Sequence, residues 1–158
     1  MIFTKDKITV KLYDSRKEMG EIAASDTAAK IEELLLVKDE INIIFAAAPS
    51  QNEFLASLVK ENRIDWSRIN AFHMDEYIGL EEDAPQRFGH FLKESIFGKV
   101  PFKQVNYING KALPSEECAR YEALLKQYPA DIVCLGIGEN GHIAFNDPDV
   151  ANFNDSHL

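Results

Sequence analysis

The chain has 158 residues, 46% of them hydrophobic and 27% charged, which is the composition of a folded domain with a sizeable core. Its formal net charge of −9 argues against nucleic acid and anionic membranes as partners, because both attract basic surfaces. No apolar run approaches the roughly 18 residues that cross a bilayer, so we expect residues 1–158 to form a single cytoplasmic domain.

Apolar patterns along the chain predict alternating strands and helices. The expected elements, in chain order, are a strand at 8–13, a helix at 15–37, a strand at 41–47, a helix at 50–60, a strand at 69–74, a helix at 87–97, a strand at 105–109, a helix from 114 and a strand at 131–137. This alternation implies right-handed crossovers and a mainly parallel sheet with helices on both faces, a Rossmann-like α/β fold. Cys118 and Cys134 fit no metal or redox spacing and have apolar neighbours, so we expect both in the core.

Open parallel sheets bind ligands beyond the carboxyl ends of their strands, and three such ends here carry polar residues. The first is AAAPSQNE at 46–53, where a helix start offers free amides and a positive dipole end to a phosphate. Ser50, Gln51 and Asn52 are the expected phosphate-binding side chains. The alternative is purely structural, because Ser50 and Glu53 have the separation of a capping box.

The second polar strand end is HMDEYIGL at 73–80, in which the carboxylates Asp75 and Glu76 are adjacent. A carboxylate at this edge of a parallel sheet is well placed to act as a base. Adjacent carboxylates in a loop are, however, equally typical of a solvated surface, so this segment alone does not decide between the two interpretations.

The third polar strand end is LGIGENGHIAFNDP at 135–148. Gly136 and Gly138 end an apolar strand and allow a ligand to approach the backbone. His142 and Asp147 lie five residues apart, so the carboxylate can orient the imidazole if the turn folds back. A histidine beside a glycine is otherwise more often a surface or capping residue than a catalyst.

Together, MDEYIGL at 74–80 and GIGENGHIAFNDP at 136–148 resemble the glucosamine-6-phosphate deaminase family, within the wider group that includes 6-phosphogluconolactonases. The resemblance covers the whole chain and implies conversion of glucosamine 6-phosphate to fructose 6-phosphate with release of ammonia. It implies that Asp75 moves a proton between C2 and C1 of the opened sugar, and that His142 handles the ring-oxygen proton. Asp147 stands where the family commonly has glutamate, and Asn140 where some members have aspartate.

By the same resemblance, Asn140 and Asp147 complete an acid-base relay with His142, in which the amide fixes the tautomer of the ring without supplying charge. Glu76, Gly138 and Gly141 are expected to contact the substrate. No metal or cofactor is expected, because the histidines and acids lack ligand spacing, and a carboxylate and an imidazole suffice for proton transfer between adjacent carbons.

Two alternative functions stay open. Lactone hydrolysis, as in the sister branch of the group, would leave the carboxylate of MDEY without a role, because water is then activated at a carbonyl. A sugar-phosphate sensor without turnover is the other alternative, because the phosphate loop and the relay differ from those of well-known deaminases. The sequence also leaves a homo-oligomer open.

Family members continue well beyond this length, and their additional residues supply a lid and basic contacts to the phosphate. We therefore expect the 158 residues to be a fragment, incomplete at the C-terminal side of the sheet. The stretch 150–158 has the pattern of neither a helix end nor a terminal strand. Because the expected phosphate site lacks basic side chains in an acidic chain, we expect weak or absent turnover from these residues alone.

Overall fold

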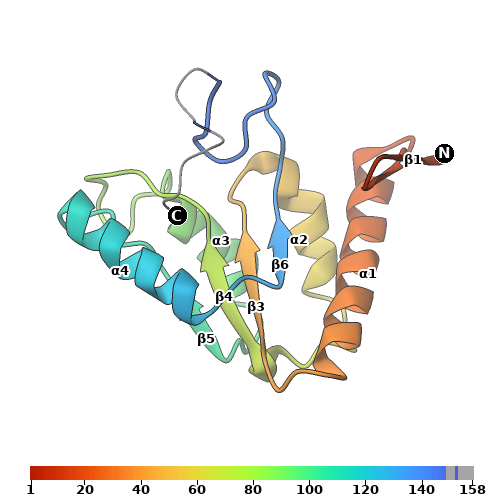
Figure 1. The fold of residues 1–158 in the computed structure, drawn as a ribbon, viewed down its shortest axis with the longest axis horizontal. Helices are drawn as coiled ribbons and strands as arrows, with labels where there is room; N and C mark the ends of the chain where they lie inside the picture. Colours follow the sequence, from red (N-terminus) through yellow and green to blue (C-terminus); the bar gives the residue numbers. More distant parts are fainter. Residues whose placement is uncertain (149–151, 153–158) are drawn as a thin grey trace.

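The computed structural model describes residues 1–148 and 152, so the expectation for the stretch 150–158 falls largely outside the described residues. A parallel four-stranded sheet lies at its centre (Figure 1). The strands, in spatial order, are β5 (Gln104–Asn106), β4 (Ile69–His73), β3 (Ile41–Phe45) and β6 (Ile132–Cys134). No helix in the described part of the chain is both long and apolar enough to cross a membrane.

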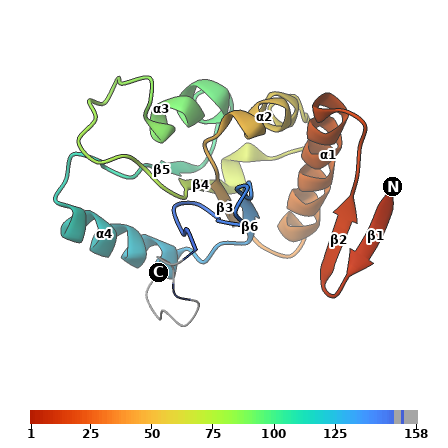
Figure 2. The ribbon, with the colours of Figure 1, turned by 90° about the horizontal axis from the view of Figure 1, so that it is seen from above.

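Helices cover both faces of this sheet, as Figure 2 shows most clearly. The helices on one face are α1 (Arg16–Leu35), α2 (Asn52–Leu58) and α3 (Phe88–Leu92). The opposite face carries α4 (Pro114–Gln127). The Rossmann-like α/β architecture predicted from the alternating pattern is therefore confirmed.

The core lies between β3, β4 and the helices α1 and α2. The side chains of Ile41, Ile43 and Phe45 alternate along β3 and are all fully buried, as are Ala28 and Ile31 of α1. All five residues of β4 are buried, which is typical of a central parallel strand covered on both faces. The sheet is thus a rigid support for the loops that leave its carboxyl edge.

A close approach of α1 to α2 is possible because residue 20 is glycine. A Cβ atom at this position would lie 2.6 Å from the Cβ of Glu53 and 2.8 Å from the backbone nitrogen of Phe54. The absence of a side chain therefore sets the distance between the two helices. The first helix begins at the expected place, because the Ser15 hydroxyl caps it by accepting from the amide of Glu18.

The strand expected at 8–13 does not join the parallel sheet. It forms β2 (Ile8–Lys11), which pairs antiparallel with β1 (Ile2–Lys5) in a separate two-stranded hairpin. Asp6 adopts a positive φ of 53° in the tight turn between the two strands. A partner two residues away requires very little loop closure, and this explains why the local pairing replaces the expected sheet pairing.

Two local details differ from the expectations. The helix expected at 87–97 consists of α3 followed by a π-helical turn, η3 (Lys93–Phe97). Ser50 does not cap a helix, because it lies inside a 3₁₀ turn, η1 (Pro49–Gln51), and Glu53 pairs with Arg16 instead. A second 3₁₀ turn, η2 (Trp66–Arg68), precedes β4.

Of the two cysteines expected in the core, Cys134 is buried and Cys118 is exposed. The buried residues of α4 are Glu117 and Tyr121, and residue 118 is rotated by about 100° from the first of them. The thiol at position 118 consequently lies on the solvent side of the helix.

Candidate active site

Three loops that follow neighbouring strands line one cavity of about 260 Å³. They come from the carboxyl ends of β4, β3 and β6, with β3 in the middle. The lining residues are Ala46, Ala47, Ala48, Ser50, Met74, Asp75, Phe88, Gly136, Ile137, Gly138, His142, Ala144 and Phe145. Parallel strands end at the same edge of a sheet, and this is why segments so far apart in the chain meet here.

Asp75 lies two residues after the end of β4 and is half-buried in the lining of this cavity. Burial raises the pKa of its carboxyl above the ordinary value, and the charge of the neighbouring Glu76 raises it further. A carboxylate with a raised pKa is a stronger base toward a carbon acid than an aspartate in water. The cavity therefore contains one carboxylate that is suited to proton abstraction.

Glu76 does not line the cavity, so the structure does not support the expected contact with the substrate. Its fully buried carboxylate accepts hydrogen bonds from the backbone amides of Phe88 and Gly89, each 3.0 Å long, and pairs with Arg87 at 3.3 Å. These amides belong to the first turn of α3, which has free N–H groups that need acceptors. Glu76 is thus the N-terminal cap of α3.

His142, Asn140 and Asp147 form a connected chain of polar contacts. The Asn140 amide nitrogen donates to Asp147 Oδ1 at 2.9 Å, so the amide oxygen faces the ring and lies 2.6 Å from His142 Nδ1. A carbonyl oxygen only accepts, and Nδ1 must therefore carry the proton. In the neutral ring the lone pair is then on Nε2, which leaves this nitrogen available for proton exchange.

Gly138 allows the imidazole to pack against the backbone. A Cβ atom at this position would lie 2.2 Å from His142 Cε1, closer than any side chain permits. The backbone amide of Gly138 also donates to the carbonyl of His142 at 2.9 Å. Gly141 has a positive φ of 87°, a conformation that favours glycine and closes the turn, but it does not line the cavity.

Of the three side chains expected to bind phosphate, only Ser50 lines the cavity. Gln51 is buried beneath it, with Nε2 lying 3.4 Å from the Ser50 hydroxyl, and Asn52 is exposed outside the lining. Among the described residues, no lysine or arginine lines this cavity. Phosphate binding by these residues stays a prediction.

An aromatic wall, made of Tyr77, Phe88 and Phe145, borders the cavity. The ring centroids lie 4.8 Å apart for Tyr77 and Phe88, and 5.9 Å apart for Phe88 and Phe145. Phe88 lies within the helix expected at 87–97, and no local signal in the sequence distinguishes it from the other apolar residues of that helix. A larger cavity of about 660 Å³ has Arg87 in its lining and contains none of the expected site residues.

The sequence model of the glucosamine-6-phosphate isomerases/6-phosphogluconolactonases matches residues 14–151 of the chain. The chain belongs to this family. Curated members that resemble it include the glucosamine-6-phosphate deaminase of Listeria innocua, 37% identical over 82% of the chain, and that of Streptococcus sanguinis, 41% identical over 72% of it.

Solved structures of the same family have the same fold. A monomeric glucosamine-6-phosphate deaminase is 29% identical over 87% of the chain, with a TM-score of 0.76. The 6-phosphogluconolactonase of Thermotoga maritima is 25% identical over 85% of the chain, with a TM-score of 0.74. The chain covers 58% and 61% of these two structures, and 56% and 48% of the two curated relatives, so it spans about half the length of family members.

Proposed function

We propose that the protein carrying this sequence converts glucosamine 6-phosphate to fructose 6-phosphate and ammonia. The supporting observation is that Asp75, with its raised pKa, and His142, with its lone pair on Nε2, line the same cavity. The curated relatives named above are deaminases, and their identity to this chain exceeds that of the lactonase. Deamination is therefore favoured over lactone hydrolysis.

The chemistry requires two proton transfers that these residues are suited to carry. His142 Nε2 accepts the proton of the anomeric hydroxyl and returns it to the ring oxygen, which opens the sugar. Asp75 then removes the proton from C2 while the C1 carbonyl oxygen takes up a proton lost by the C2 ammonium group, which gives an enolamine. Asp75 delivers the C2 proton to C1, so that C1 becomes a hydroxymethyl carbon and the C2 amine becomes an imine. Water adds to this imine, and its breakdown gives the ketone of fructose 6-phosphate and ammonia.

Ammonia release from glucosamine 6-phosphate tests this proposal. We expect turnover by the complete protein that carries this sequence, and Asp75→Asn to lower its kcat by about 100-fold or more, because an amide cannot abstract the C2 proton. Asp14→Asn is the matched control, because Asp14 is an exposed aspartate outside the cavity. Its turnover is expected to equal that of the wild type.

Two results would contradict the proposed deaminase function and indicate a different one. Hydrolysis of 6-phosphogluconolactone without ammonia release would indicate a lactonase, for which the C2 base has no role. Tight binding of glucosamine 6-phosphate without any turnover would indicate a sugar-phosphate sensor, as considered from the sequence.

A further inference from the structure

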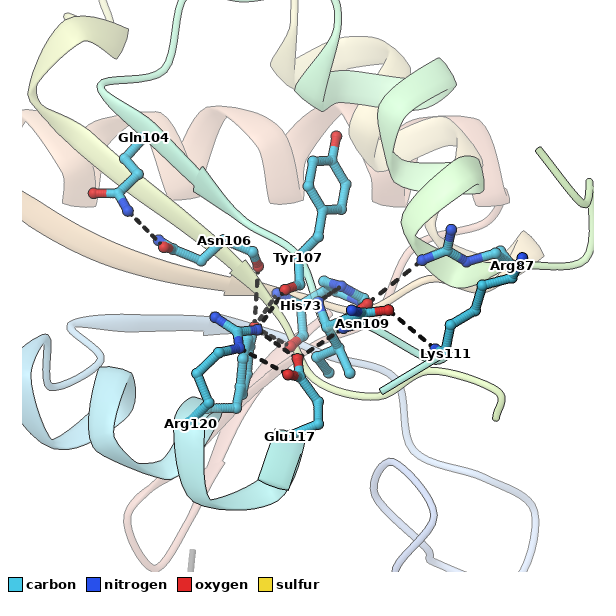
Figure 3. A network of polar contacts seen from close by, with 11 residues as sticks. His73, Arg87, Gln104, Asn106, Tyr107, Asn109, Lys111, Glu117 and Arg120 are labelled. Carbon is cyan, nitrogen blue, oxygen red and sulfur yellow. Dashed lines mark hydrogen bonds and ion pairs between the residues drawn. The ribbon is translucent and has the colours of Figure 1, made fainter. Parts of the chain in front are cut away.

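His73 is a buried histidine for which the proposed reaction has no direct use. It is the last residue of β4, only 1% of its surface is exposed, and it does not line the cavity. Both ring nitrogens nevertheless have partners: Nδ1 lies 2.9 Å from the carbonyl oxygen of Asp75, and Nε2 lies 2.9 Å from the amide nitrogen of Ile108. Figure 3 shows the ring within a larger polar network.

These two partners define the protonation state of the ring. The Asp75 carbonyl only accepts, so Nδ1 must donate, and the Ile108 amide only donates, so Nε2 must accept. Burial lowers the pKa of His73 to about 4, while the charges of Glu76 and Arg87 act in opposite directions on it. The ring is consequently neutral near pH 7, with its proton on Nδ1.

Helix α4 holds the backbone of His73 in place. The Tyr121 hydroxyl accepts from the His73 amide at 3.0 Å and donates to its carbonyl at 2.7 Å. The segment that includes Ile108 is attached to the same helix, because Glu117 accepts from the Asn109 amide at 2.7 Å (Figure 3). The imidazole thus connects the loop after β4 to the segment that includes Ile108. Helix α4 anchors both this segment and the backbone of His73.

We propose that His73 is a positioning residue for Asp75, because its neutral ring ties the Asp75 peptide to Ile108 and so holds the carboxylate in the cavity. The role of Asp75 as base rests on the proposed function, whereas the tie itself does not depend on it. Without the tie, the peptide is free to rotate and the carboxylate moves toward water. Turnover then falls while substrate affinity changes little, because His73 itself does not touch the cavity.

Two substitutions of different chemistry separate this role from simple packing. His73→Leu removes both hydrogen bonds, whereas His73→Asn keeps a donor close to the position of Nδ1 and loses only the contact with Ile108. The readouts are the titration of the Asp75 carboxyl by ¹³C NMR, and kcat and KM for glucosamine 6-phosphate. Near-ultraviolet circular dichroism checks that each variant is folded.

In His73→Leu we expect the Asp75 midpoint to fall toward the ordinary value of 3.8, with kcat about tenfold lower at unchanged KM. In His73→Asn, which keeps the hydrogen bond to the Asp75 carbonyl but loses the one from Ile108, we expect both quantities to change in the same direction by a smaller amount, because one half of the tie remains. A folded His73→Leu variant with an unchanged Asp75 midpoint would overturn the proposal. A shifted midpoint in a protein without ammonia release would support the tie and overturn only the proposed deaminase function.

The wild-type protein provides a test that survives any failure of the variants to fold. Two-bond ¹H–¹⁵N spectra distinguish the tautomers of a neutral imidazole. We expect His73 to have its proton on Nδ1 at pH 7 and to remain neutral down to pH 5. A proton on Nε2, or titration near pH 6.5, would overturn the proposal.

Discussion

Gly138 is the residue that determines where the imidazole of His142 can lie. The ring occupies the volume that a side chain at position 138 would need, and the atoms in conflict belong to a flexible side chain rather than to the backbone. A methyl group at this position therefore displaces the ring without requiring the loop to unfold. Because Asn140 contacts the ring at only one nitrogen, a displaced ring loses the hydrogen bond that sets its tautomer.

We expect Gly138→Ala to fold normally but to change the ¹⁵N signals of the His142 ring and to lower kcat at least tenfold, through loss of proton exchange. Gly136→Ala is the matched control for the ring signals, because a Cβ atom there would lie at an ordinary 3.5 Å from the Ser50 hydroxyl. Unchanged His142 signals in Gly138→Ala would show that the loop adapts and that the contact has no functional role.

Among the secondary-structure elements, α3 is a five-residue helix that is capped by a side chain from a distant loop. Its N-cap residue, Arg87, provides no side-chain cap, and the carboxylate of Glu76 takes that place from eleven residues earlier in the chain. Because the charge of Glu76 also raises the pKa of Asp75, the same carboxylate links the stability of α3 to the basicity of the site.

Glu76→Ala is expected to lower the free energy of unfolding by about 3 kcal/mol, because it leaves two part-buried amides of α3 without their acceptor and removes the carboxylate that pairs with Arg87. It is also expected to lower the pKa of Asp75, because a negative charge beside that carboxyl is removed. Urea unfolding and ¹³C NMR measure the two effects. Glu94→Ala, at an exposed position in η3, should change stability by less than about 0.5 kcal/mol.

At the scale of the whole molecule, the buried His73 makes stability depend on pH. Its pKa is about 4 in the folded protein and 6.5 as the ordinary value. Between these two values the unfolded chain takes up a proton that the folded protein does not, so stability falls as the pH is lowered from 6.5 to 4. Above pH 6.5 the ring is neutral in both states and has no such effect.

The difference between the two pKa values corresponds to roughly 3 kcal/mol at the acidic end of this range. Urea unfolding of the wild type and of His73→Asn at several pH values between 7 and 4 measures it, because the remaining titratable groups are common to both proteins. We expect a steeper loss of stability in the wild type. Parallel curves for the two proteins would contradict a buried neutral histidine.

The short-range pattern of the chain was sufficient for most helices and strands and for the sheet edge at which Asp75 and His142 meet. The helix at 15–37 and the strands at 41–47 and 69–74 were predicted correctly within a few residues, because a buried face repeats with the period of its own element. The meeting of Asp75 and His142 at one sheet edge follows from the alternating pattern, since parallel strands have their carboxyl ends on the same side.

Contacts between distant segments were decided only by the folded structure. The sequence contains no sign that Glu76 caps α3, that His73 reaches Ile108, or that residues 8–11 pair with a hairpin partner rather than the sheet. Each of these outcomes depends on which polar groups are brought within about 3 Å of one another and withdrawn from water. Periodicity describes which face of an element is buried, but the partner of a buried polar group depends on the packing of several elements at once.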